Sequence, residues 1–261
     1  MKIATFNING VRARIAILLD WLAEAQPDVV VLQEIKTQAE AFPAEPIADL
    51  GYTVETHGQK GFNGVAILSK YPLEAVTRGL PGDEADEQAR YIEATVIGTR
   101  ALRVAGLYLP NGNPFPGPKF DYKLAWMERL RLRAAELLAT EAPVVMGGDY
   151  NVIPEPRDAA KPEAWVEDAL FLPESRAAFR RIVHQGWTDA IRVNDPHATR
   201  GPFTFWDYQR QSWERDNGIR IDHLLLSPQA ADLMRGAGVD RDQRAGEKPS
   251  DHVPVWVDLA A

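Results

Sequence analysis

Short apolar segments recur along the whole chain, and they constrain its fold more strongly than any other feature. Each has seven to nine residues and is bounded by Gly, Pro, Asp or charged positions. The segments read KIATFNI, DVVVLQE, GVAILSK, YIEATVI, LRVAGLYLP, PVVMGGD, IRIDHLLLS and VPVWVDL. Their length and β-branched content favour buried strands, because helices need longer periodic patterns. The sequence therefore predicts a protein rich in β-sheet.

Helical patterns lie between some of these segments. Residues 11–25 carry Ile15, Leu18 and Leu22 at helical spacing, residues 119–139 repeat such a pattern, and a further helix is expected after LPES. Strands and helices do not alternate strictly, and hairpins are expected to join GVAILSK to YIEATVI and YIEATVI to LRVAGLYLP. Two mixed sheets packed face to face with helices outside would bury these runs, which predicts an α/β fold.

The connections indicate one folding unit over residues 1–261, since no Gly- or Ser-rich linker divides the chain. The Pro-rich stretch 110–118 is expected to be a stiff loop, and 152–172 a long irregular insert. Loops of that length inside a compact domain are usually functional or mobile.

Composition limits the function classes. With 37 acidic and 29 basic residues the net charge is −8, which excludes a sequence-blind, basic nucleic-acid coat. A local DNA-binding face stays possible if a divalent cation offsets carboxylates. The absence of cysteine excludes disulfides and thiolate metal sites. No run approaches the ~18 apolar residues of a membrane span, and the first residues lack a signal-peptide core. We expect a soluble, cytoplasmic monomer with no membrane partner.

Polar side chains gather at or near the ends of the apolar segments. They are Asn7, Asn9, Glu34, Tyr108, Asp149, Asn151, Asp222, Asp251 and His252. Asp and Asn often end strands simply as turn residues, and that interpretation stays open for each of them alone. Asp222 fits it least, because a carboxylate within an apolar segment is costly to bury without a partner. His252 is the obvious partner, and the pair would fix the tautomer of the imidazole.

Several carboxylates at one edge of a sandwich would repel one another, and a divalent metal would relieve this. Oxygen ligands without cysteine favour Mg²⁺ or Mn²⁺ over Zn²⁺. Together with amides, a tyrosine hydroxyl and an Asp–His pair, such a site has the parts to hydrolyse a phosphodiester.

Seven blocks carry a resemblance to a known family. In order, they are KIATFNINGVRAR, PDVVVLQEIK, GVAILSK, GLYLPNG, GDYNVIP, RIDHLLLS and EKPSDHVPVW. Together they resemble the exonuclease III family of abasic-site endonucleases, part of the endonuclease/exonuclease/phosphatase superfamily. The resemblance implies a four-layer α/β-sandwich and a Mg²⁺-dependent enzyme, with Mn²⁺ as a substitute. Its expected substrate is double-stranded DNA, cut 5′ to abasic sites, with 3′→5′ exonuclease and 3′-end trimming activity.

The resemblance also implies roles for individual residues. Glu34 matches the principal metal ligand, and the other residues in or near the metal shell would be Asn9 and Asp251. Asp149 matches the aspartate that activates the attacking water. The phosphate would be oriented or polarised by Asn7, Tyr108 and Asn151. His252, held by Asp222, matches the histidine at the scissile phosphate, either as a proton donor or as a stabiliser of charge.

Further residues are expected at the DNA. Phe62 matches a loop residue presented to the minor groove, where a ring could wedge a base step. Arg90 lies near an expected binding loop, and Phe205 and Trp206 match an aromatic wall around a flipped-out abasic sugar. Core packing or simple solvation remains the ordinary alternative for each. Several relatives have Trp where this chain has Phe205, which leaves the balance of endonuclease and exonuclease activity open.

Two other functions are compatible with this type of chain. A catalytically silent nucleic-acid-binding regulator could share the fold, but it should have lost metal or phosphate residues, and none is missing here. A lipid or inositol phosphate hydrolase of the same superfamily would keep the chemistry and change the substrate. The EKPSDHVPVW and QKGFNGVAILSK blocks favour the DNA-repair branch.

Overall fold

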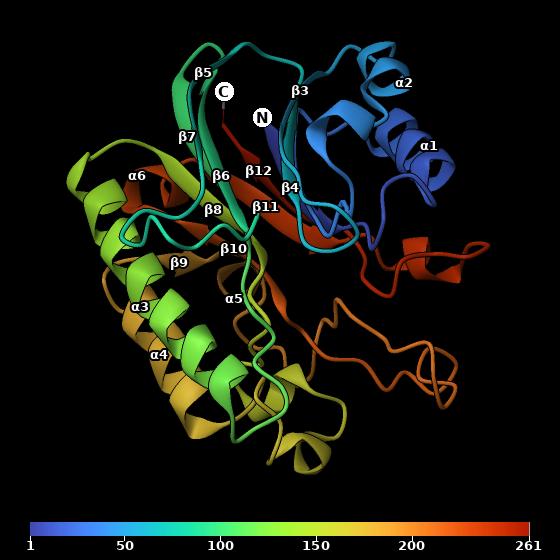
Figure 1. Ribbon diagram of the computed structural model, residues 1–261, viewed down its shortest axis with the longest axis vertical. Coiled ribbons are helices and arrows are strands. Elements are labelled where there is room, and N and C mark those ends of the chain that lie inside the picture. The colour runs from blue at the N-terminus through green and yellow to red at the C-terminus, as the bar shows by residue number, and fades with distance from the viewer. Residues whose placement is uncertain (261) are drawn as a thin grey trace.

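The computed structural model describes residues 1–260, which form two six-stranded β-sheets packed face to face (Figure 1). The first sheet has the strand order β11-β12-β1-β2-β4-β3. Its strands are β1 (Lys2–Asn7), β2 (Val29–Gln33), β3 (Thr53–His57), β4 (Val65–Ser69), β11 (Met234–Val239) and β12 (Val255–Leu259). In this sheet β1 and β2 run parallel, and their other neighbours are antiparallel.

The second sheet has the strand order β5-β6-β7-β8-β10-β9. Its strands are β5 (Leu73–Arg78), β6 (Tyr91–Ile97), β7 (Ala101–Tyr108), β8 (Val144–Asp149), β9 (Thr188–Asp189) and β10 (Asp222–Leu226). Here β7 and β8 form the parallel pair. Both sheets are therefore mixed, as the sequence predicts.

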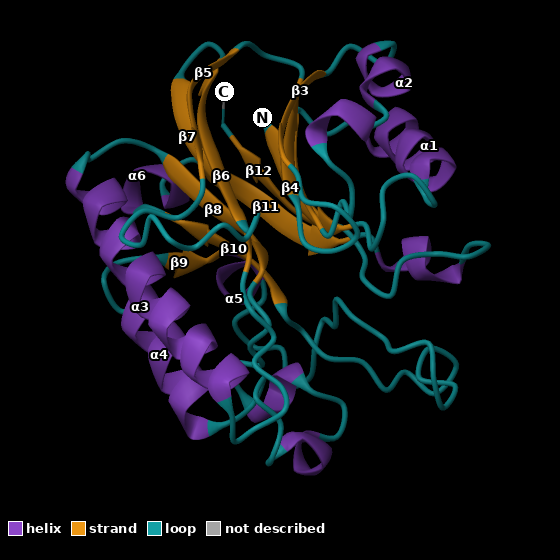
Figure 2. Ribbon diagram, in the orientation of Figure 1, coloured by secondary structure: helices purple, strands orange, loops and turns teal. Residues whose placement is uncertain are grey.

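Four helices of the described chain cover the outer faces of the sheets (Figures 1 and 2). They are α1 (Ile15–Ala25), α2 (Ala44–Ala48), α3 (Pro118–Ala139) and α4 (Pro173–Val183). Two short helices, α5 (Ala190–Asn194) and α6 (Pro228–Ala231), add residues to the apolar core between the sheets. Helix α1 packs on the first sheet through a cluster that includes Trp21 and Phe6. Helices α3 and α4 pack on the second sheet through Trp126, Phe179 and Met146. Residues 1–260 thus form the expected four-layer α/β-sandwich.

The alternation of side chains along each central strand builds these layers. In β2, Val29 and Val31 face the second sheet, whereas Val30 and Leu32 face α1. Close packing between the sheets requires small residues opposite Val31. A Cβ atom on Gly147 would lie 3.2 Å from Val31 Cγ2 and 3.5 Å from Thr5 Cβ, so β8 approaches the first sheet closely at that glycine.

Three expected features of the fold need correction. GVAILSK and YIEATVI do not form a hairpin, because β4 lies in the first sheet and β6 in the second. Strand β5 follows β4 instead, crosses to the second sheet and pairs with β6. The first helix begins at Ile15, since residues 11–14 form a turn. Asp222 is the first residue of β10 and not an interior one.

The central strands of both sheets send their carboxyl ends to the same edge of the sandwich. Asn7 ends β1, Tyr108 ends β7 and Asp149 ends β8, while Glu34 directly follows β2. Long loops gather at this edge, including the expected insert 152–172, whose only regular structure within the described residues is two short 3₁₀ helices (Figure 2). The fold thereby concentrates polar side chains where the sheets end.

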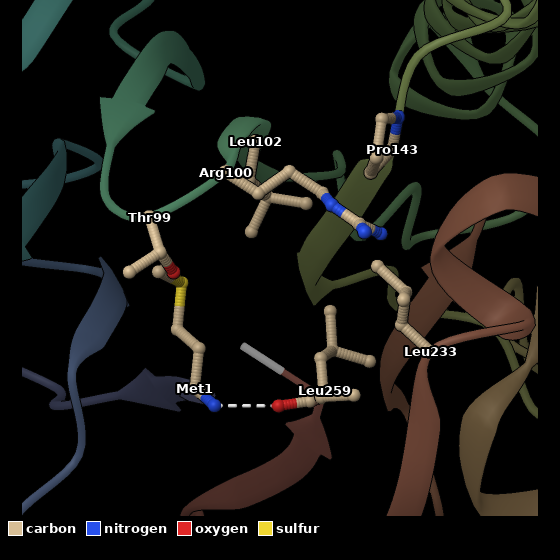
Figure 3. A pocket seen from close by; sticks show the side chains of 8 residues that line it. Met1, Thr99, Arg100, Leu102, Pro143, Leu233 and Leu259 are labelled. Atoms are coloured by element: carbon tan, nitrogen blue, oxygen red, sulfur yellow. Dashed lines mark hydrogen bonds between the residues drawn. The ribbon is translucent and has the colours of Figure 1, made fainter.

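The opposite edge of the sandwich holds both ends of the described chain (Figure 1). The Met1 amino group donates to the carbonyl of Leu259, and an apolar cavity of about 20 Å³ lies beside them (Figure 3). That volume is roughly what one water molecule needs, so this cavity does not accommodate a larger ligand. Among residues 1–260, the helices are all too short or too polar to cross a membrane.

Candidate active site

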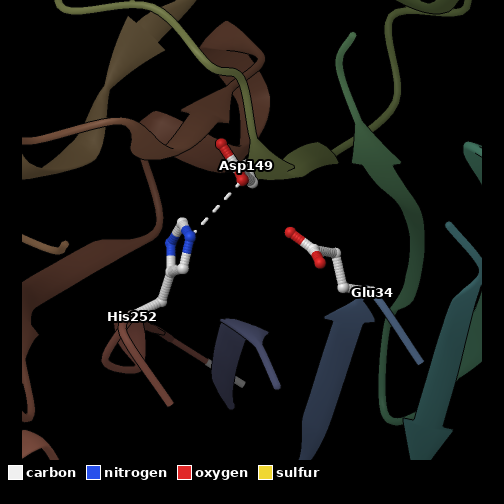
Figure 4. A group of neighbouring side chains, drawn as sticks. All are labelled: Glu34, Asp149 and His252. Carbon is white, nitrogen blue, oxygen red and sulfur yellow. Dashed lines mark ion pairs between the residues drawn. The ribbon is translucent and has the colours of Figure 1, made fainter. Parts of the chain in front are cut away.

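One buried amide joins the two sheets at the polar edge. Asn7 is fully buried at the end of β1, and its Nδ2 donates to Glu34 Oε1 and to Asp149 Oδ2, at 3.0 Å each. Its Oδ1 accepts the backbone N–H of Asn9. Two carboxylates from different sheets are therefore held together by one neutral donor. Glu34, Asp149 and His252 each offer a ligand atom, and these atoms lie within 4.8 Å of one another (Figure 4).

The second oxygen of Glu34 faces a cation. Lys36 Nζ lies 2.8 Å from Glu34 Oε2 and also donates to Asn9 Oδ1. Asn9 in turn donates to Asp251 Oδ1 at 2.9 Å. Burial opposes ionisation of Glu34, but hydrogen bonds from Lys36 and Asn7 lower its pKa below the ordinary value.

These contacts test whether the site suits a metal. Glu34, Asn9 and Asp251 present hard oxygen donors, which suit a divalent cation that prefers oxygen ligands. An ammonium group already lies against two of these residues, so their oxygens gather around positive charge. The donor set therefore fits a hard divalent cation. An alternative set, composed of Glu34, Asp149 and His252, shares only Glu34 with it.

The Asp222–His252 pair expected from the sequence is formed. His252 Nδ1 lies 2.8 Å from Asp222 Oδ2, and both side chains are buried. The other ring nitrogen, Nε2, lies 3.7 Å from Asp149 Oδ2 (Figure 4). Burial alone would lower the pKa of His252, but Asp222 and Asp149 outweigh it and raise the pKa to about 10. The two aspartates therefore favour the charged imidazole, whose Nε2 is directed toward Asp149.

Asp149 has the protonation behaviour of a general base near neutral pH. Burial raises the pKa of its carboxyl group to about 7, against the pull of His252. Its Oδ1 accepts the backbone N–H of Asn151 at 2.9 Å, so the carboxylate is fixed on both sides. A base poised near the working pH is effective in proton transfer.

Several site residues adopt left-handed backbone conformations, which non-glycine residues rarely do. The φ angles are 48° at Asn9, 50° at Glu34, 54° at Lys36 and 46° at Asn151. Such conformations persist only where surrounding contacts over-determine them, and they cluster at functional sites. Backbone hydrogen bonds supply such contacts. The N–H groups of Asn9 and Asn151 donate to the side chains of Asn7 and Asp149. The Glu34 carbonyl accepts from Gly10, and the Lys36 N–H donates to the Asn63 carbonyl.

Tyr108 and Arg90 stack beside the carboxylates. Burial, together with Glu34 and Asp149, raises the pKa of Tyr108 well above its ordinary range, so its hydroxyl stays protonated. The Arg90 guanidinium lies 4.9 Å from the centre of the Tyr108 ring and donates to the Tyr108 carbonyl. Arg90 therefore holds Tyr108 in place through its ring and its carbonyl. The sequence did not indicate these contacts.

The aromatic residues expected at the DNA differ in exposure. Phe62 lies on the loop between β3 and β4, and its side chain is 59% exposed. This loop adjoins the site, because the backbone N–H of Lys36 donates to the carbonyl of Asn63. Phe205 packs edge-on against His252, with ring centres 4.9 Å apart. Trp206 is fully buried and packs against Phe203 and Trp213. The Trp206 side chain is therefore inaccessible to a substrate, since it packs in an apolar cluster with Phe203 and Val253.

Two cationic residues at the site escaped the sequence reasoning. Lys36 stands two positions after Glu34 in QEIK, and this spacing was the only sign in the sequence that it could lie near Glu34. Lys123 is fully buried on α3, between Phe120 and Met127 on the apolar face of the helix. A lysine on a buried helix face is the signal that could have found it. Burial lowers the pKa of Lys123 to about 7, while Asp149 and Asp168 act to raise it.

Comparison with known proteins agrees with this geometry. Residues 4–252 match the model of the endonuclease/exonuclease/phosphatase family. The chain belongs to that family. An exodeoxyribonuclease III from Haemophilus influenzae is 38% identical to this chain and covers 99% of it, with 100% of that protein matched.

Solved structures are similar over their full length. A 3′-5′ exonuclease from Neisseria meningitidis is 36% identical with a TM-score of 0.95, and 100% of each chain is covered. An AP endonuclease from Archaeoglobus fulgidus is 35% identical with a TM-score of 0.94, again with 100% of each chain covered. Both structures share the sandwich described above.

Proposed function

We propose that this protein is a metal-dependent DNA repair phosphodiesterase that incises double-stranded DNA 5′ to abasic sites and trims 3′ ends. The observation that carries the proposal is the buried array in which Asp222, His252 and Asp149 converge on Glu34. The similar Neisseria protein, described as a 3′ phosphatase, was solved with a product DNA hairpin, which supports DNA as the substrate.

In the proposed reaction, water attacks phosphorus and the bond from phosphorus to the 3′ oxygen of the upstream nucleotide breaks. The departing 3′ oxygen takes a proton from His252 or from solvent, which leaves a 3′ hydroxyl and a 5′ phosphate. Asp149 takes the proton of the attacking water, a role that its raised pKa suits. The hydroxyl of Tyr108 and the second N–H of the Asn151 side-chain amide are neutral donors for the phosphoryl oxygens. Asn7, whose two side-chain N–H groups already bond to Glu34 and Asp149, orients those carboxylates at the phosphate. His252 adds a positive charge at the phosphate, oriented by Asp222.

The cofactor is proposed to be Mg²⁺, with Mn²⁺ able to replace it. It would be held by Glu34, with Asn9 and Asp251 in or near its shell. When bound, the cation supplies positive charge that offsets the charge developing on the phosphoryl oxygens. All other steps above rest on side chains of this chain.

The DNA contacts are proposed for Phe62, Phe205 and Arg90. An exposed ring at Phe62 supports insertion at the minor groove. Phe205 is proposed to border an extruded abasic sugar, and its packing against His252 supports this. Arg90 would act mainly by holding Tyr108. We also propose that the protein is cytoplasmic and acts as a monomer; sedimentation at micromolar concentration would test the monomeric state.

A labelled duplex with one abasic site tests the proposed function. The protein is incubated with it in Mg²⁺ and, separately, in EDTA, and an undamaged duplex of the same sequence is the control. We expect one cut on the 5′ side of the abasic site, only with metal. An abasic duplex that survives in both conditions, with hydrolysis of a lipid or inositol phosphate instead, would overturn the proposal.

A further inference from the structure

Lys123 on α3 bonds to the backbone of two loops at the active site. Its Nζ donates to the carbonyl of Asn151 at 2.6 Å and to the carbonyl of Asn111 at 3.0 Å. Asn111 follows β7, and Asn151 follows β8. One side chain therefore ties together the ends of the two strands that carry Tyr108 and Asp149.

The chain makes room for this side chain. A Cβ atom on Gly112 would lie 2.7 Å from Lys123 Cδ and 3.2 Å from the Cβ of Ala169. Gly112 also has a φ of 92°, which favours glycine. The loop after β7 thus folds over the lysine stem, and the ammonium group reaches the loop after β8.

The bond to Asn151 acts on a residue whose orientation matters for the reaction. Asn151 has a φ of 46°, and its N–H donates to Asp149 Oδ1 at 2.9 Å. Its side-chain amide donates to the Leu109 carbonyl at 2.8 Å, and its Oδ1 accepts from Asn111 at 3.3 Å. The bond from Lys123 to the Asn151 carbonyl helps to hold this uncommon backbone conformation. It thereby also fixes the direction of the Asn151 N–H, which orients Asp149.

Packing alone does not account for a lysine at this position. The side chain is fully buried, and its ammonium group bonds to neutral carbonyls. An unbranched apolar side chain such as methionine would fill much of the same volume without burying a charge, which is costly.

We propose that Lys123 is a positioning residue, which sets the Asn151 amide and the Asp149 carboxylate for attack on the phosphate. This inference rests on the proposed function. It assigns Lys123 no contact with DNA, because its side chain is enclosed. Loss of the ammonium group should therefore affect the chemical step and leave substrate binding nearly intact.

The test compares Lys123→Met with wild type on the abasic duplex under Mg²⁺. Arg131→Met is the matched control, since Arg131 is on the same helix and its side chain pairs only with Glu128 in the described structure. We expect kcat of Lys123→Met to fall on the order of 100-fold, as misplacement of catalytic groups does. KM should change little, and Arg131→Met should keep both constants. If Lys123→Met does not fold by circular dichroism, Lys123→Gln replaces it.

A rescue experiment separates positioning from general damage. The chain has no cysteine, so Lys123→Cys can be alkylated at a single site while unfolded and then refolded. Aminoethylation restores an amine at nearly the original length and should restore kcat, whereas alkylation with iodoacetamide should not. Wild type taken through the same steps controls for refolding.

The outcomes distinguish the two proposals. If wild type does not cut the abasic duplex, the proposed function fails. If wild type cuts and a folded Lys123→Met or Lys123→Gln keeps its kcat, the positioning role is wrong. The same follows if the loss lies only in KM, or if aminoethylation restores no activity while refolded wild type is active.

Discussion

Replacing Asn7 by leucine should expose the repulsion between the two central carboxylates. The substitution keeps the approximate shape of the side chain and removes the Nδ2 donor that lies 3.0 Å from both Glu34 and Asp149. The carboxylate oxygens lie within 4.8 Å of each other. At an effective dielectric constant of about 20, two unit charges at that separation repel by about 3 kcal/mol.

The amide offsets this repulsion in the wild type. Two hydrogen bonds to charged acceptors contribute about 1.5–3 kcal/mol each, which is the same order as the repulsion. We therefore expect Asn7→Leu to lower the free energy of unfolding by about 3 kcal/mol in EDTA at a pH well above the pKa of Asp149, where both carboxylates are ionised. Mg²⁺ should recover part of this loss, because a bound cation reduces the repulsion that the amide no longer offsets.

Urea unfolding followed by circular dichroism, with EDTA and with Mg²⁺, measures both effects. Thr5→Val is the matched control, because Thr5 on the same strand donates to Gln33 in a buried neutral pair. That variant should lose only about 1 kcal/mol and show no added response to Mg²⁺. Equal stability of Asn7→Leu and wild type in EDTA, or the same gain from Mg²⁺ in both, would refute the reasoning.

Other predictions concern His252, Phe62 and Glu93. Asp222→Asn removes the anion that holds His252, so kcat on abasic DNA should fall at least 100-fold, roughly the share of a general acid–base group; a near-normal kcat would contradict the pairing. Phe62→Ala should change the free energy of unfolding by less than about 0.5 kcal/mol yet weaken binding of abasic duplex in a gel shift, and an unchanged Kd would exclude that contact. Burial opposes ionisation of Glu93, but bonds from Arg133, Tyr91 and Arg103 lower its pKa below 4.5. Its stabilisation is present above that value and is lost as pH falls through the folded pKa. Glu93→Gln should therefore have a lower free energy of unfolding than wild type in urea at pH 7, and this difference should disappear in acid. A difference that does not change with pH would argue against the ionised Glu93 as its source.

The sequence predicted the strands that are buried on both faces and missed those at the edges. β2 and β4 are buried at every residue, so they appear as continuous apolar runs. β3, β5 and β11 contain exposed or half-buried residues and interrupt their alternation with Thr, Glu, Arg or Gly. Because β5 was not predicted, β4 and β6 were expected to be adjacent strands, and the predicted hairpin between them was wrong.

The site was predictable where burying a residue without a partner would cost free energy. A carboxylate as enclosed as Asp222 needs a partner, and His252 is that partner. The contacts of Lys36 with Asn9, and of Lys123 with Asn111 and Asn151, join segments far apart in the sequence, and local patterns do not contain that information. Trp206 shows the converse, because an aromatic residue beside Phe205 can face either the core or the substrate.

The most direct test of the account is single-turnover cleavage of abasic duplex by Asp149→Asn in saturating Mg²⁺, with the Kd for the same duplex measured in parallel. Asn keeps the size of the side chain and cannot take a proton from water. We predict that the cleavage rate falls by at least about 100-fold while the Kd stays close to that of wild type. A variant that binds and cuts at nearly the wild-type rate would contradict the assignment of Asp149 as the base.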